Sequence, residues 1–146
     1  MRSIAALVFP GFETLDLFGP IEMFGMLPEE FGLSIVAECE GEIVTTHGQR
    51  VCVDHTFAAA QSFDMLLRPG GPGTRTQVNN PAMMDWLKAK AAEAEIVMSV
   101  CTGSALLAKA GLLDGCKATS NKMSFEWFRQ QGPDVDWIAR ARWVED

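Results

Sequence analysis

The stretch that decides the fold is Ile96-Val97-Met98-Ser99-Val100-Cys101-Thr102-Gly103-Ser104. Residues 96–100 form a short, almost continuously apolar run, which is typical of a strand buried on both faces. The residues from Thr102 to Ala110 favour a helix that ends at Gly111, where helices commonly carry a terminating glycine. A buried strand that passes directly into a helix is the repeating unit of parallel α/β sheets.

The rest of the chain alternates between the same two patterns. Apolar or alternating runs predict strands over residues 4–9, 33–37, 43–46, 50–54, 64–68 and 135–144. Helical patterns cover residues 124–130 and 15–27, the latter with an interruption expected at Gly19-Pro20. A further helix is expected from Pro81 to about Ala92, with Asn80 as its N-cap. The predicted fold class is therefore α/β, a doubly wound, mostly parallel sheet with helices on both faces.

Composition indicates one globular domain over residues 1–146. The chain carries 12 Lys and Arg against 19 Asp and Glu, a net charge of −7, and 48% of its residues are hydrophobic. This acidic balance argues against nucleic-acid and membrane-surface partners. No window is long and apolar enough for a membrane span. The four cysteines show no C-x-x-C spacing and a chain of this size needs no disulfide, so we expect a cytoplasmic protein.

Cys101 is the candidate nucleophile, because it stands where the buried strand turns sharply into the helix. Ser99 and Gly103 flank it with the small residues that such an elbow requires. The helix N-terminus favours a thiolate over a thiol, and its free N–H groups can stabilise an oxyanion. The alternative is a buried structural cysteine, since free cysteine is among the most buried residue types.

Asp16 is the candidate proton donor. It lies between Leu15 and Leu17 in an otherwise apolar helix, where burial would raise the pKa of its carboxyl and suit it to general acid catalysis. A solvated residue or a helix cap is the alternative. His47 and His55 lie in or beside the strand pair 43–54, so both are predicted to be surface residues, and neither a Cys-His dyad nor a metal site is expected.

The loop Pro69-Gly70-Gly71-Pro72-Gly73 follows the strand at 64–68 and lacks the ending of a phosphate-binding loop. It is either a plain turn or a place where glycine lets the backbone approach a ligand. In the second interpretation, an amide of this loop lies opposite Cys101 and completes an oxyanion hole.

Taken together, several segments resemble the ThiJ/PfpI superfamily, which has a class I glutamine-amidotransferase-like, flavodoxin-like fold. The matching segments are residues 7–12, 15–20, 64–73, 99–104 and 110–119, and the resemblance spans the whole chain. An Asp in L-D-L-x-G-P together with C-T-G-S is most similar to the isonitrile hydratase branch, which hydrates isocyanides to N-substituted formamides.

The resemblance implies a role for each matching position. Cys101 would attack the terminal isonitrile carbon to give a thioimidate, and Asp16 would supply a proton and then help water to resolve the adduct. Thr102 would help to shape the site, and the Gly71 amide would face the substrate beside Gly70 and Gly103. No cofactor is implied. Other members of the superfamily suggest two alternatives, a glyoxalase- or deglycase-like enzyme that uses the same thiol on an aldehyde and a non-catalytic sensor domain.

The chain departs from the family pattern at a few places. Ser120-Asn121-Lys122 stands where isonitrile hydratases usually have a His-Trp pair, Arg68 replaces an aliphatic residue, and Cys116 stands where a basic residue is common. The domain is expected to be short at its C-terminus relative to the family. The predicted strand 135–144 would leave Trp137 and Trp143 on one uncovered face, which favours association, and family members are commonly dimers, so we expect a homodimer.

Overall fold

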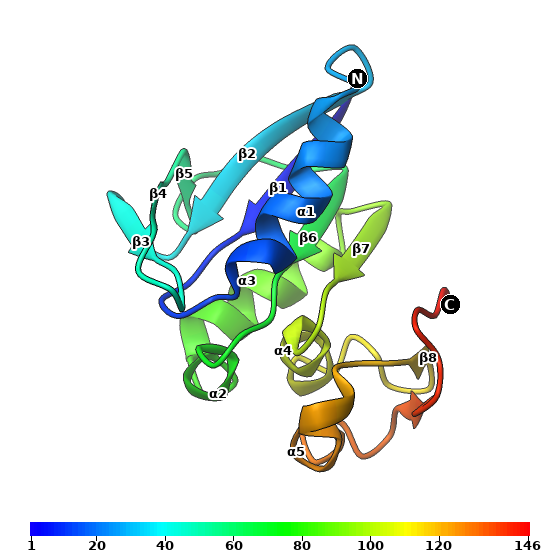
Figure 1. Cartoon of the computed structure of the whole chain (residues 1–146). Coiled ribbons are helices and arrows are strands. Elements are labelled where there is room, and N and C mark those ends of the chain that lie inside the picture. The colour runs from blue at the N-terminus through cyan, green and yellow to red at the C-terminus, as the bar shows by residue number, and fades with distance from the viewer.

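The computed structural model describes residues 1–146 and contains a five-stranded parallel sheet in the order β5-β2-β1-β6-β7 (Figure 1). Its strands are β1 (Arg2–Leu7), β2 (Phe31–Ala37), β5 (His55–Thr56), β6 (Met65–Arg68) and β7 (Ile96–Ser99). The carboxyl ends of β1, β6 and β7 are neighbours, and they point toward the end of the molecule where α2, α4 and α5 gather (Figure 1). Segments that follow these three strands therefore meet at one edge.

Five α-helices accompany the sheet: α1 (Thr14–Gly25), α2 (Thr74–Gln77), α3 (Pro81–Ala91), α4 (Gly103–Lys109) and α5 (Phe125–Arg129). The crossover from β1 to β2 and the crossover from β6 to β7 run in opposite directions along the sheet. Because such crossovers are right-handed, α1 and α3 cover opposite faces, as Figure 1 shows. The predicted α/β fold class is thus confirmed, and the Asn80 side chain caps α3 as expected, accepting from the N–H groups of Ala82 and Met83.

The core is built around the central strands. Residues 4–9 are all nearly or fully buried, as are residues 65–68, which explains the uninterrupted apolar run that marks the first strand. One residue in this apolar core is charged. Arg68, the last residue of β6, is fully buried, and none of its three guanidinium nitrogens has a hydrogen-bond partner.

The helix break predicted at Gly19-Pro20 is wrong, because α1 continues through Pro20. Proline at this position removes only the hydrogen bond to the Asp16 carbonyl, four residues earlier. Tertiary packing outweighs that loss, since Leu17 is fully buried and Phe24 packs edge-to-face on Phe31 of β2.

The long strand predicted over residues 135–144 is also wrong. Only β9 (Asp136–Trp137) forms there, pairing with the equally short β8 (Lys117–Ala118). Beyond β9 the Thr119 hydroxyl donates hydrogen bonds to the carbonyl oxygens of Ile138 and Ala141, at 2.9 and 3.2 Å. The backbone therefore turns away instead of extending the strand pairing. Trp137 and Trp143 do not share an uncovered sheet face: Trp137 packs on Phe128, whereas Trp143 is 75% exposed.

The segments at 43–46 and 50–54 form a separate antiparallel pair, β3 (Glu42–Val44) with β4 (Arg50–Cys52), outside the main sheet. The fifth sheet strand is instead β5, which is too short to leave a periodic signal. A single 3-10 turn, η1 (Lys122–Ser124), precedes α5. No helix in the structure has both the length and the hydropathy needed to cross a membrane.

Candidate active site

Cys101 occupies a strained elbow between β7 and α4. It is the one residue other than glycine with a positive φ, 53°, a conformation that costs about 1–3 kcal/mol and is found mainly where function requires it. The residue two positions after Cys101 must be small. A Cβ on Gly103 would lie 2.7 Å from the Arg68 carbonyl oxygen and 2.8 Å from that of Pro69. The sharp turn expected from the sequence is therefore present.

Asp16 lies in the first turn of α1 and is brought to the elbow by the loop that follows β6. Its Oδ2 accepts a hydrogen bond from the Gly70 N–H at 3.1 Å. Partial burial raises the pKa of the Asp16 carboxyl, and the negative charge of Glu13 adds to this shift. Hydrogen bonds from Gly70 and from the Cys101 side chain oppose it without cancelling it. A carboxyl with a raised pKa thus faces the thiol, although 85 positions separate the two residues in sequence.

The glycine loop is held against both segments. Gly71 has φ 114°, and a Cβ there would lie 2.5 Å from the Glu13 nitrogen, so only glycine fits. The Gly71 N–H donates to Thr102 Oγ1 at 3.0 Å, and Thr74 Oγ1 lies 3.2 Å from that same hydroxyl. A substrate atom could use the Gly71 amide only by displacing Thr102 Oγ1, so its predicted role stays a prediction. By contrast, the N–H of Thr102 itself makes no hydrogen bond within the chain.

Two residues missed by the sequence reasoning also contact Cys101. Asn121 Nδ2 donates to Cys101 Sγ at 3.1 Å, and Ser120 Oγ donates to the Cys101 carbonyl oxygen at 2.8 Å. Both lie in the segment between β8 and η1, which no periodic pattern connects to the elbow. The only signal available was that these positions depart from the family pattern.

Neither histidine contacts the thiol. His47 is largely exposed, as predicted, but its Nε2 lies 3.0 Å from Glu13 Oε1, and Glu13 is the residue whose charge raises the pKa of Asp16. His55 lies in β5, at the far edge of the sheet from β7. No three His, Cys, Asp or Glu side chains cluster closely enough to hold a metal ion.

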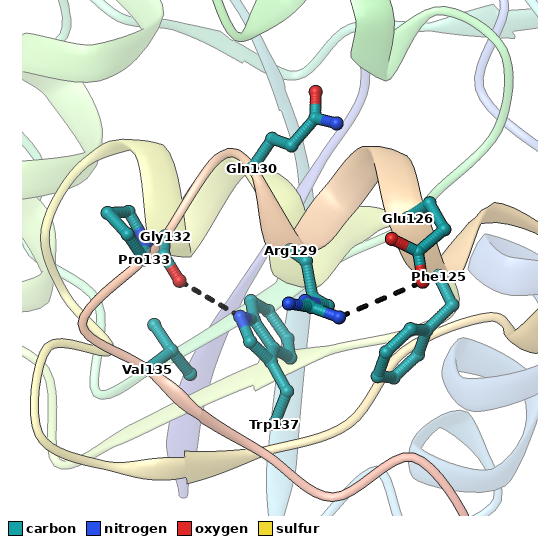
Figure 2. A pocket seen from close by; sticks show the side chains of 8 residues that line it. All are labelled: Phe125, Glu126, Arg129, Gln130, Gly132, Pro133, Val135 and Trp137. Atoms are coloured by element: carbon teal, nitrogen blue, oxygen red, sulfur yellow. Dashed lines mark hydrogen bonds and ion pairs between the residues drawn. The ribbon is translucent and has the colours of Figure 1, made fainter.

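One well-formed pocket lies away from Cys101. It has a volume of about 540 Å³ and lies between α5 and β9, where the Trp137 indole donates to the Gly132 carbonyl oxygen at 2.9 Å (Figure 2). Arg129 and Glu126, three residues apart on α5, both line it, with 3.8 Å between Nη1 and Oε1. None of the residues around Cys101 lines this pocket. The candidate site is therefore defined by the convergence of polar groups on the elbow, not by this pocket.

Comparison with known proteins points to one family. The DJ-1/PfpI family model matches residues 2–145. The isonitrile hydratase of Pseudomonas putida is 33% identical over 118 residues, which are 81% of this chain and 51% of that protein. Deglycase TK1284 of Thermococcus kodakarensis is 30% identical over 140 residues, covering 92% of this chain and 82% of that one. The crystal structure of a ThiJ/PfpI family protein from Pseudomonas syringae superposes with a TM-score of 0.90 at 33% identity, over 99% of this chain and 59% of its own. The chain thus spans about half the length of the isonitrile hydratase.

Proposed function

Because this chain belongs to the DJ-1/PfpI family, we propose that it is a cysteine-dependent enzyme that hydrates an isonitrile to an N-substituted formamide. One observation carries the proposal: the Cys101 elbow faces a half-buried Asp16 whose pKa burial raises. A carboxylate with a raised pKa is a stronger base toward the thiol proton, and the carboxyl that forms retains that proton closer to neutral pH, as a general acid must. Isonitrile hydration needs such a partner, because the carbon that the thiol attacks must also be protonated.

The proposed reaction passes every proton through Asp16. The thiol proton moves to the carboxylate, and the Cys101 thiolate forms a C–S bond to the terminal isonitrile carbon. Asp16 returns the proton to that carbon, which leaves a thioimidate, Cys–S–CH=N–R. Water then adds to the same carbon, and Asp16 carries one of its protons to the nitrogen. When the C–S bond breaks, the formamide HCO–NHR is released and the hydroxyl proton returns to the sulfur through Asp16.

Thr102 contributes through its backbone and its hydroxyl. Its unpaired N–H is the amide directly after the nucleophile, the position that supplies an oxyanion hole in other elbow enzymes. In the proposed reaction, this N–H would stabilise the oxygen of the tetrahedral water adduct. Its hydroxyl holds the Gly71 amide, so its role there is to position the glycine loop.

A deglycase-like activity on an aldehyde is the second candidate. It is favoured by the similarity to Deglycase TK1284, which extends over more of both chains than the similarity to isonitrile hydratase. Attack on an aldehyde carbon produces an alkoxide instead of a carbanion, so it depends more on the Thr102 N–H and less on a proton donor beside the sulfur. The half-buried Asp16 is the reason for ranking the isonitrile first.

The test is turnover of cyclohexyl isocyanide and of an aryl isocyanide, with formamide followed by proton NMR and methylglyoxal assayed in parallel. We expect formamide from the wild type and none from Cys101→Ala. Cys116→Ala is the matched control, since it removes another half-buried thiol at a position outside the site. Isocyanide hydration no faster than in Cys101→Ala would refute the proposal, and turnover of methylglyoxal alone would establish the second candidate.

All four cysteines are free, and we further propose a reducing, cytoplasmic setting.

A further inference from the structure

The Cys101 sulfur is contacted from two sides. Asp16 approaches from α1, and Asn121 approaches from the segment that follows β8. A thiol has one proton to donate and can accept a hydrogen bond at the same time. The hydrogen bond to Asp16 uses the donor, and the bond from Asn121 Nδ2 uses the acceptor, so the sulfur lies between an acidic group and an amide.

The orientation of the Asn121 amide is determined by a second hydrogen bond. Its Oδ1 accepts from the Met123 N–H at 2.8 Å and caps the 3-10 turn η1. A backbone N–H can only donate, so the oxygen of the amide must face Met123 and the NH₂ group must face Cys101 Sγ. Ser120 fixes the same segment to the elbow through the Cys101 carbonyl oxygen. The donor is thus aimed at the sulfur before any substrate arrives.

We propose that Asn121 is a further member of the catalytic site, an uncharged donor that stabilises the Cys101 thiolate and leaves proton transfer to Asp16. Hydrogen bonds to a charged acceptor are about twice as strong as those between neutral groups, so the Asn121 bond favours the thiolate over the thiol. An amide does not titrate at accessible pH, and it therefore cannot compete with Asp16 for the proton. The cation next to Asn121 in the chain, Lys122, donates to Thr119 Oγ1 at 2.6 Å. This assignment rests on the proposed role of Cys101 as the nucleophile.

Two substitutions separate a role at the sulfur from a role in the turn. Asn121→Asp keeps an oxygen for the Met123 N–H, and Asp is as good a cap as Asn, but it places an acceptor with negative charge against Sγ. Asn121→Ala removes both the donor and the cap. A role at the sulfur makes the Asp variant the more damaging one, whereas a merely structural role makes the Ala variant worse. Met123→Ala is the matched control, because this side chain in η1 is 95% exposed and its loss keeps the backbone N–H that donates to Asn121 Oδ1.

The experiment measures the rate of Cys101 alkylation by iodoacetamide against pH, with peptide mass spectrometry reading Cys101 separately from the other cysteines. At pH 7 we expect alkylation to slow roughly tenfold in Asn121→Ala and further in Asn121→Asp, with the midpoint pH rising in the same order. Met123→Ala should keep the wild-type midpoint. Thermal unfolding of each variant checks folding, and Asn121→Ala keeps the test available if Asn121→Asp does not fold.

A wild-type midpoint in Asn121→Asp, or slower alkylation in the Ala variant than in the Asp variant, would overturn the proposal. The assay uses no isonitrile, so it can succeed even when no isonitrile is hydrated. If wild-type Cys101 reacts no faster than the exposed Cys39, the nucleophile itself is refuted, and the role of Asn121 falls with it. Failure of the proposed substrate and failure of the Asn121 assignment are thereby distinguishable.

Discussion

Arg68→Met should make the protein more stable. Arg68 ends β6 with its side chain fully buried and its three guanidinium nitrogens without partners, and desolvation lowers its pKa to about 9, well below the ordinary value of an arginine. A pKa difference of one corresponds to about 1.36 kcal/mol, so holding this charge in the core costs on the order of 5 kcal/mol at neutral pH. Methionine fills a similar space without the charge, and replacing buried charges by apolar residues stabilises proteins by about 1–4 kcal/mol.

The same pKa difference predicts how stability depends on pH. The folded protein loses the Arg68 proton as pH passes about 9, whereas the unfolded chain keeps it up to the much higher pKa of an ordinary arginine. Between these two pKa values the unfolded state binds more protons, so the wild type gains stability with rising pH. The full cost of burying the Arg68 charge applies only below about pH 9. The advantage of Arg68→Met should therefore be largest at pH 7 and smaller at pH 10.

Urea unfolding of both proteins, followed by tryptophan fluorescence at pH 7 and pH 10, measures this difference. Arg50→Met is the matched control: Arg50 is largely exposed and pairs with Glu42 at the surface, so its loss should change the free energy of unfolding by less than about 0.5 kcal/mol. If Arg68→Met is destabilised, or if its advantage does not change with pH, the guanidinium is not an uncompensated charge and the argument is refuted.

Three further predictions concern catalysis and assembly. Asp16→Asn keeps the shape of the side chain but cannot carry a proton, so isocyanide hydration should fall roughly 100- to 10,000-fold, and near-normal turnover would exclude Asp16 as the acid. Glu13→Gln removes a negative charge that helps to raise the pKa of Asp16, so the alkaline limb of the pH–rate profile should move to lower pH. An unchanged limb would show that the charge of Glu13 does not affect the pKa of Asp16. We propose that the surface formed by Met23 of α1 and Met26 just after this helix, which are 72% and 74% exposed, associates with a second copy. Light scattering should then give about twice the 16.0 kDa chain mass for the wild type, and the mass of one chain for the double variant Met23→Lys, Met26→Lys. A wild-type monomer at all concentrations would contradict the proposal.

Local signals predicted the parts of the structure that local physics controls. The apolar run before Cys101, the small residues around it and Gly111 after α4 indicated an elbow between a buried strand and a helix, because a sharp turn limits side-chain size at neighbouring positions. Asn80-Pro81 indicated the start of α3 for a similar reason, since a helix end needs a cap within a few residues.

Only tertiary packing decided where these local elements extend and which side chains meet. The alternating pattern over 135–144 contains no information about a partner strand, and with only two residues of β8 to pair with, it forms β9 and then turns. The Pro20 break failed because burial of Leu17 outweighs one lost hydrogen bond. Asp16 could be suspected from its apolar neighbours, but its place beside Cys101 depends on β1, β6 and β7 lying side by side. Asn121 left no periodic trace at all, because a single side chain that reaches a sulfur across the fold is a long-range contact, and sequence patterns record only short-range ones.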